Sequence, residues 1–200
     1  MSKLVILRHG EKPLKKVKDG ALKLAPDGKA RARFLAETYL GKGTEKSLLD
    51  VRAPPAFFAI TPHTIETACP SAMQWRLPIT AYFTVPDGTS KDAALDTRTD
   101  EAAQEIKRTL REGKTVVAIW EHHRIAGTDP DAKCTLWKSL NLGAARAPND
   151  WCDEDFDSIW TFDWEDGDPK NFRRLRQEFA APPRKKKGKS KTKRGKGSSR

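Results

Sequence analysis

Hydrophobic residues gather in a few short runs along this chain, and the runs differ in kind. Residues 4–7, 56–60 and 115–120 are almost continuously apolar. Runs of this length without polar alternation are typical of parallel strands that are buried on both faces. Residues 157–164 instead alternate polar and apolar side chains, which predicts a half-buried strand. A further strand or extended loop is predicted at 78–85.

Between these strands, apolar positions recur at the spacing of an α-helix. The segment 99–111 is the clearest case, because its apolar residues share one face and its charged residues occupy the other. Pro70 is expected to confine or delay the helix that contains it, since proline lacks a backbone donor. The predicted helices are 25–40, 68–75, 99–111, 134–140 and a short final one at 171–179.

The charge of the chain is concentrated at one end. Ten of its 38 Lys and Arg residues lie between 184 and 200, where there is no acidic residue, so the rest holds 28 basic and 27 acidic residues. We predict one domain at 1–180 and a disordered Lys/Arg-rich tail at 181–200. The 184–200 segment is suited either to non-specific contact with a polyanion or only to solubility. The near-neutral body argues against a nucleic-acid-binding protein.

The sequence carries no sign of a membrane or of an oxidising compartment. No apolar run approaches the length of a membrane span, and the run at 4–7 comes too early for a signal peptide. The three cysteines, Cys69, Cys134 and Cys152, fit neither a disulfide framework nor a zinc site. We therefore expect a cytoplasmic protein without a membrane partner.

The first strand ends abruptly in a cation, an imidazole and a glycine. Arg8, His9 and Gly10 directly follow the run at 4–7. Ligands of open α/β sheets bind at the carboxyl ends of the strands. A guanidinium binds phosphate with a planar fork, a neutral imidazole can attack phosphorus, and glycine allows a close backbone approach. The alternative is a strand followed by a solvated polar turn.

The sequence Arg-His-Gly-Glu at 8–11, directly after an N-terminal apolar strand, resembles the signature of the histidine phosphatase superfamily, also called the phosphoglycerate mutase-like family. The resemblance implies that His9 is a nucleophile that forms a phosphohistidine and that Arg8 belongs to the phosphate pocket. It implies a three-layer α/β/α sandwich with a mostly parallel central sheet. It implies neither a metal nor an organic cofactor.

A second motif of the family is present in altered form. Thr67 and Ala68 match a Thr-Ala pair of the family, but His63 stands four residues before Thr67, where the family has a second phosphate-binding arginine. Histidine lacks the permanent charge and the bidentate fork of arginine. We interpret His63 as a weaker phosphate ligand. The alternative is a surface histidine near the start of a helix.

The remaining site residues follow the strand at 115–120 and a later turn. In the family, the second catalytic histidine sits at the carboxyl end of such a strand, and His122 fits that register. His123 is the alternative if the strand is one residue longer, and otherwise a candidate phosphate ligand. The resemblance also asks for a carboxylic acid that protonates the leaving group. Asp87 is the first candidate and Asp92 the next, although Asp87-Gly88 also fits a plain turn.

Two functions from different classes remain open. The first is hydrolysis of a phosphomonoester, with a small phosphorylated substrate or a phosphopeptide as the partner. The second is a catalytically degenerate member of the family that binds a phosphorylated ligand without turnover. The altered motif at His63 separates them: if Arg52 or Arg124 supplies a second guanidinium to the pocket, activity is favoured, and if Arg8 stands alone, binding is favoured.

Overall fold

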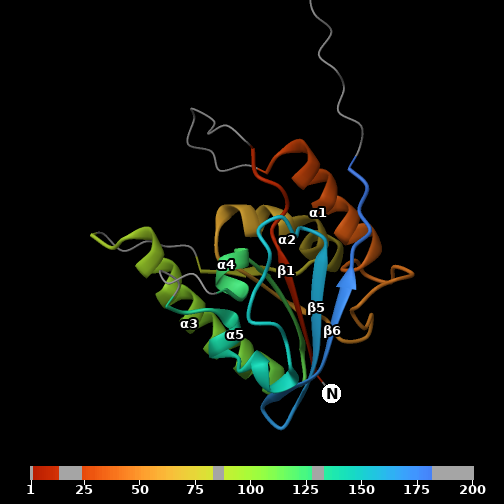
Figure 1. Ribbon diagram of the computed structural model, residues 1–200. Coiled ribbons are helices and arrows are strands. Elements are labelled where there is room, and N and C mark those ends of the chain that lie inside the picture. The colour runs from red at the N-terminus through yellow and green to blue at the C-terminus, as the bar shows by residue number, and fades with distance from the viewer. Residues whose placement is uncertain (1, 14–23, 83–87, 128–132, 182–200) are drawn as a thin grey trace, which may run out of the picture.

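A computed structural model of the chain shows a six-stranded sheet with helices on both faces (Figure 1). The structure describes residues 2–13, 24–82, 88–127 and 133–181. The strands lie in the order β3-β2-β4-β1-β5-β6. In chain order they are β1 (Ser2–Arg8), β2 (Ala56–Ala59), β3 (Ile79–Ala81), β4 (Thr115–Trp120), β5 (Ser158–Glu165) and β6 (Asp168–Arg176).

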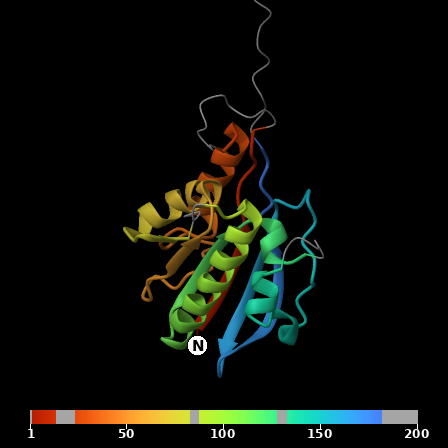
Figure 2. The same cartoon turned by 90° about the vertical axis from the view of Figure 1, so that its left-hand side faces the viewer.

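Five α-helices and one 3-10 helix accompany the strands within the described residues. The helices α1 (Pro26–Thr38) and α2 (Pro62–Trp75) lie together on one side of the sheet, and α3 (Lys91–Arg111) lies on the other (Figures 1 and 2). The short helices are α4 (His122–Ile125), α5 (Leu136–Ser139) and the 3-10 helix η1 (Leu142–Ala145).

The central strand β1 contributes to two separate hydrophobic cores because its side chains alternate between the faces of the sheet. Leu4 and Ile6 pack in the core beneath α3, α4 and α5. Val5 and Leu7 pack in the core beneath α1 and α2. All four side chains are fully buried. The continuous apolar run is therefore explained by two buried faces, and the protein is the predicted three-layer α/β/α sandwich.

The sheet is mostly parallel, as predicted. The pairs β1–β4, β4–β2 and β2–β3 are parallel, whereas β5 pairs antiparallel with β1 and with β6. Parallel neighbours end at the same edge of a sheet, so the residues that follow β1, β2 and β4 are brought together there. This edge lies opposite the N-terminus (Figure 1).

The prediction of a final helix at 171–179 is wrong, because the segment forms the edge strand β6. Phe172 and Leu175 are three residues apart, which suggested a helical face. An odd spacing places two strand residues on opposite faces, and Phe172 packs against the core beneath α3 while Leu175 packs against the core beneath α1. The register of β5 and β6 also shifts between Thr161 and Asp163.

Two helices begin earlier than predicted. α3 starts at Lys91 and not at 99, because Ser90 caps it by accepting a hydrogen bond from the Ala93 amide over 3.2 Å. α2 starts at Pro62 and continues through Pro70. A capping box between Thr61 and Thr64 fixes its start, so Pro70 neither delays nor ends the helix.

Some sequence predictions fall outside the described residues. Asp87, the first candidate for the proton donor, is one of them, and so is the segment 182–200 of the basic tail. Within the part of the chain that the structure describes, no helix is long and apolar enough to cross a bilayer.

Candidate active site

The candidate site lies at the carboxyl end of β1, where Arg8 and His9 are 7% and 1% exposed and Gly10 is buried. A Cβ atom at Gly10 would come within 2.7 Å of the Gly28 carbonyl oxygen, so only glycine lets this loop cross the start of α1 so closely. The Gly10 amide donates to Thr67 Oγ1 over 2.9 Å, which ties the loop to α2 as well. The loop is thus held against two helices, through the Gly28 backbone of α1 and the Thr67 side chain of α2.

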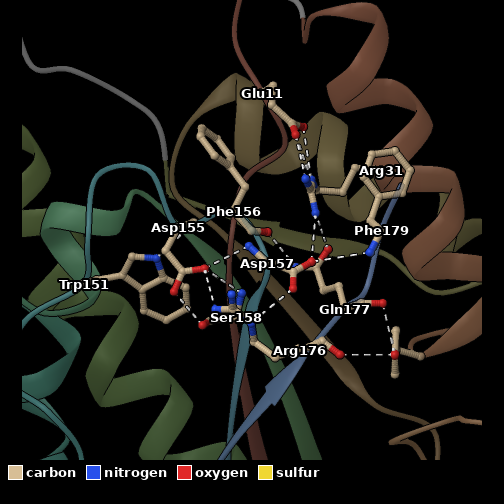
Figure 3. Close-up of polar contacts among 11 residues, drawn as sticks. Glu11, Arg31, Trp151, Asp155, Phe156, Asp157, Ser158, Arg176, Gln177 and Phe179 are labelled. Atoms are coloured by element: carbon tan, nitrogen blue, oxygen red, sulfur yellow. Dashed lines mark hydrogen bonds and ion pairs between the residues drawn. The ribbon is translucent and has the colours of Figure 1, made fainter. Parts of the chain in front are cut away.

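Glu11 is held by a buried arginine of α1. The Arg31 guanidinium donates to both carboxylate oxygens of Glu11, with N–O distances of 2.7 to 3.1 Å. It also donates to Gln177 Oε1 over 3.0 Å and lies 3.7 Å from Asp157 Oδ1. Figure 3 shows these contacts converging on Arg31 from three segments of the chain. We call this group of four residues the Arg31 clamp.

The Arg31 clamp also helps to position Phe156. The Gln177 side chain donates from Nε2 to the Phe156 carbonyl oxygen over 2.9 Å. On the other side, Trp151 Nε1 donates to the carbonyl oxygen of Asp155 over 2.9 Å (Figure 3). The ring of Phe156 covers the guanidinium of Arg8, with 3.8 Å between Cζ and the ring centroid. Phe156 therefore forms one wall of the site from a segment that no sequence motif singled out.

Arg8 is a buried cation that forms no ion pair with any carboxylate of the described residues. Its Nη1 donates to the backbone carbonyl of Asp153, and its Nε has no hydrogen-bond partner in the described part of the chain. Burial lowers the pKa of Arg8, and the negative charges of Glu121 and Asp153 offset part of that shift from a distance. The guanidinium stays charged at neutral pH and keeps hydrogen-bonding capacity for an anion.

The imidazole of His9 contacts a backbone carbonyl on one side and a carboxylate on the other. Its Nδ1 lies 2.6 Å from the Gly10 carbonyl oxygen, and its Nε2 lies 3.2 Å from Glu121 Oε2. Glu121 directly follows β4, and its carboxylate also accepts hydrogen bonds from Thr61 Oγ1 and Lys12 Nζ, each over 2.8 Å. The carboxylate thus links the ends of β1, β2 and β4.

The charge of Glu121 follows from these neighbours. Burial alone would raise the pKa of this carboxyl group. The close contact with His9 and the positive charges of His9 and Lys12 outweigh burial and hold the pKa of Glu121 well below its ordinary value. Glu121 is therefore ionised at neutral pH.

His63, which occupies the position of the second arginine in the family motif, lies beside His9. The two ring centroids are 5.8 Å apart, and His63 is only 8% exposed, so it is not a surface histidine. Burial, together with the charges of Lys12 and His9, lowers the pKa of His63 to about 4. The side chain is neutral at pH 7 and offers a hydrogen bond but no charge.

His122 and His123 follow Glu121 in α4. His122 Nε2 lies 2.7 Å from Asp153 Oδ1, and burial together with the charge of Arg8 lowers the pKa of His122 to about 4. Both histidines line a neighbouring cavity of about 400 Å³ together with Asp153. Asp153 contacts Arg8 through its carbonyl and His122 through its carboxylate, so it joins the ends of β1 and β4.

Neither of the two candidate replacements for the missing arginine reaches the site. Arg52 is exposed and pairs with Asp50 over 3.3 Å. Arg124 is buried, and its guanidinium nitrogens lie 3.3 Å from Asp92 and 3.5 Å from Asp96 of α3. This pairing also places Asp92, the second candidate for the proton donor, on α3 beside Arg124. Arg8 is the only arginine that lines the cavity in front of His9, as far as the described residues define it.

The cavity in front of His9 has a volume of about 660 Å³. Its lining includes Arg8, His9, Glu11, Lys12, Asp27 and Phe156. Sequence reasoning missed Lys12, Glu121 and Phe156. Glu121 was detectable, because it follows the strongest predicted strand, whereas nothing in the sequence indicates that Phe156 lies over Arg8. The described residues contain no cluster of three or more His, Cys, Asp or Glu side chains that could hold a metal ion.

Comparison with known proteins gives a likeness in structure but not in sequence. No protein-family model and no curated protein sequence matches this chain. Among solved structures, it is similar to the protein histidine phosphatase SixA complexed with tungstate, with 18% identity, a TM-score of 0.50, and coverage of 88% of this chain and 97% of the other. It is also similar to the ecdysone phosphate phosphatase of Bombyx mori in complex with tungstate. That match has 11% identity, a TM-score of 0.50, and coverage of 93% and 95%.

These matches span nearly the full length of both chains. At such low identity a structural match speaks for the fold and not for the chemistry. This chain therefore shares the phosphoglycerate mutase-like α/β fold of these solved structures.

Proposed function

We propose that this protein hydrolyses a phosphomonoester through a phosphohistidine intermediate on His9. The observation that carries the proposal is that His9 and Arg8 lie next to each other at the carboxyl end of β1. Both side chains are buried and face one cavity, and the guanidinium has no carboxylate of its own among the described residues. A buried cation without a counter-ion is costly unless an anion binds there.

In this proposal, each residue acts on one part of the phosphoryl group. His9 Nε2 attacks phosphorus, and Arg8 binds the oxygens that carry the charge of the transition state. Lys12 supplies a second positive charge. In the family, an arginine at the position of His63 supplies that charge. His63 and His122 donate hydrogen bonds. His123, whose ring centroid lies 5.1 Å from that of His122, is a further candidate ligand. Water then hydrolyses the phosphohistidine.

The second candidate function is binding of a phosphorylated ligand without turnover. The absence of Arg52 and Arg124 from the site, together with the neutral state of His63, favours it. We rank it second because Lys12 lies 2.8 Å from the same carboxylate that contacts His9, and therefore supplies a cation close to the nucleophile.

The test is turnover of p-nitrophenyl phosphate between pH 5 and 8 by the unmodified protein and by His9→Ala. We expect the substitution to abolish turnover. We also expect the unmodified protein to carry acid-labile phosphate after rapid quenching at high pH. Equal activity of the two proteins would contradict the role of His9. No turnover by either protein, with vanadate still bound by the unmodified one, would establish the binding function.

A further inference from the structure

The protonation state of His9 is the starting point of the inference. A carbonyl oxygen only accepts hydrogen bonds, so the 2.6 Å contact between His9 Nδ1 and the Gly10 carbonyl places a proton on Nδ1. Nε2 faces the carboxylate of Glu121 over 3.2 Å. A lone pair on Nε2 would be repelled by that carboxylate, so Nε2 also carries a proton in the resting site. His9 is then an imidazolium paired with an ionised Glu121.

An imidazolium has no lone pair and cannot attack phosphorus, so the Nε2 proton must leave before the reaction. Glu121 is the acceptor within reach. Its carboxylate is 4% exposed and is held in place by Thr61 and Lys12. The contact with Nε2 is within hydrogen-bond reach but not well aligned, so Oε2 lies beside the ring axis along which phosphorus approaches.

We propose that Glu121 carries the proton of His9 to the leaving group, a role that rests on the function proposed above. Glu121 Oε2 takes the proton from Nε2 as the phosphate ester binds. The freed lone pair forms the N–P bond while the bond between phosphorus and the ester oxygen breaks. The protonated Glu121 then gives its proton to that oxygen, and the alcohol leaves. One proton moves in two steps, Glu121 returns to the carboxylate, and no other reactant is needed.

Lys12 is a positioning residue in this scheme. Its Nζ lies 2.8 Å from Oε2, the oxygen that faces His9, whereas Thr61 binds Oε1. An ammonium group at this oxygen keeps the carboxylate turned toward Nε2. When Glu121 is protonated and therefore neutral, the same ammonium group attracts a negatively charged oxygen of the incoming phosphate.

The test compares two esters that differ in their need for a proton. The p-nitrophenolate ion leaves as a stable anion, whereas the alkoxide of glycerol 2-phosphate must be protonated as it leaves. For Glu121→Gln, we expect kcat/KM to fall by about 100-fold or more with glycerol 2-phosphate. With p-nitrophenyl phosphate we expect a loss of less than about 10-fold, because a neutral glutamine does not hold His9 as an imidazolium and only the protonation of the leaving oxygen is lost. A residue with only a structural role would lower both values by the same factor.

Glu66→Gln is the matched control. Glu66 also pairs with a lysine, Lys29, over 3.4 Å, and it accepts a hydrogen bond from the backbone of Leu24, but neither contact reaches His9. We expect both esters to be turned over by this variant at nearly the unmodified rate. If Glu121→Gln does not fold, as judged by circular dichroism, Glu121→Asp withdraws the carboxyl group from Nε2 and should show the same dependence on the ester.

The outcomes separate the two claims. If the unmodified protein turns over the esters and Glu121→Gln loses the same factor with both, or loses nothing, the role of Glu121 is overturned and the proposed function stands. If the unmodified protein turns over neither ester, the proposed function fails, and the role of Glu121 fails with it.

Discussion

Two buried arginines of this protein, Arg31 and Arg8, have similar surroundings except in one respect. Both are 7% exposed, and both lie under a phenylalanine ring, Phe179 for Arg31 and Phe156 for Arg8. Arg31 is surrounded by acceptors, namely the two oxygens of Glu11 and those of Gln177 and Asp157 (Figure 3). Arg8 has one carbonyl acceptor and no ion-pair partner among the described residues.

The difference shows how the same residue type serves structure in one place and chemistry in another. A buried guanidinium that brings its own carboxylates is neutralised, and removing it leaves Glu11 without its cation, whereas Asp157 keeps Arg176 over 3.3 Å. A buried guanidinium without them adds little to stability and keeps its hydrogen bonds for an incoming anion. Four predictions test this contrast, in order of decreasing effect.

Arg31→Met is expected to lower the free energy of unfolding by about 3 kcal/mol, because it leaves the Glu11 carboxylate without its buried cation and removes one of the two arginines that pair with Asp157. Urea denaturation followed by tryptophan fluorescence measures the change. Arg52→Met is the control, since its pair with Asp50 is exposed to solvent and should leave the free energy of unfolding nearly unchanged. A stability equal to that of the unmodified protein would show that the Arg31 clamp is not structural.

Arg8→Met is expected to act on anion binding and hardly on stability. Loss of two charged hydrogen bonds to phosphate corresponds to about 2.7 kcal/mol, or about a 100-fold weaker affinity for vanadate. Isothermal titration calorimetry gives the affinity, and urea denaturation should show a change within about 1 kcal/mol. A large loss of stability with unchanged vanadate affinity would reverse the contrast between the two arginines.

Mild acid is expected to weaken the pocket before it affects the Arg31 clamp, which contains no histidine. The pKa of His63 and of His122 is lowered to about 4, so each binds fewer protons in the folded than in the unfolded state between pH 6.5 and 4. Stability is therefore lost as pH falls through this window, by about 2 kcal/mol per histidine between pH 7 and pH 5. In urea denaturation at pH 7 and at pH 5, His63→Gln should lose less stability between the two pH values than the unmodified protein, by the amount that one histidine contributes. An equal loss in the variant would contradict the lowered pKa.

Phe156→Leu is expected to have the smallest effect, a roughly five-fold weaker affinity for vanadate. The substitution removes the ring that covers the Arg8 guanidinium, an interaction worth about 1 kcal/mol. Phe179→Leu makes the matched change over Arg31 and should leave vanadate affinity unchanged while it lowers stability by a similar amount. The same calorimetric titration on both variants decides between a role in the site and a role in the fold.

The sequence by itself determined the layers of the fold and the first motif of the site. All four side chains of the run at 4–7 are apolar, and only a strand that is covered on both faces buries all four. Arg8 and His9 were also predicted from sequence, because residues that follow such a strand stand at the edge where sites form. The final helix at 171–179 failed because Phe172 and Leu175 fit either period, and only the presence of β5 beside them selected the strand.

Tertiary structure alone decided which charges meet. Lys12 and Glu121 are 109 positions apart. Lys12 and His9 both contact the carboxylate of Glu121 only because β1 and β4 are neighbours in the sheet. Arg8 and Arg31 look alike in the sequence. Their roles differ because the fold places Asp157 and Gln177 beside Arg31 and not beside Arg8. Ion pairs of this kind depend on distances of a few ångströms between segments remote in the chain, and no local pattern of residues specifies them.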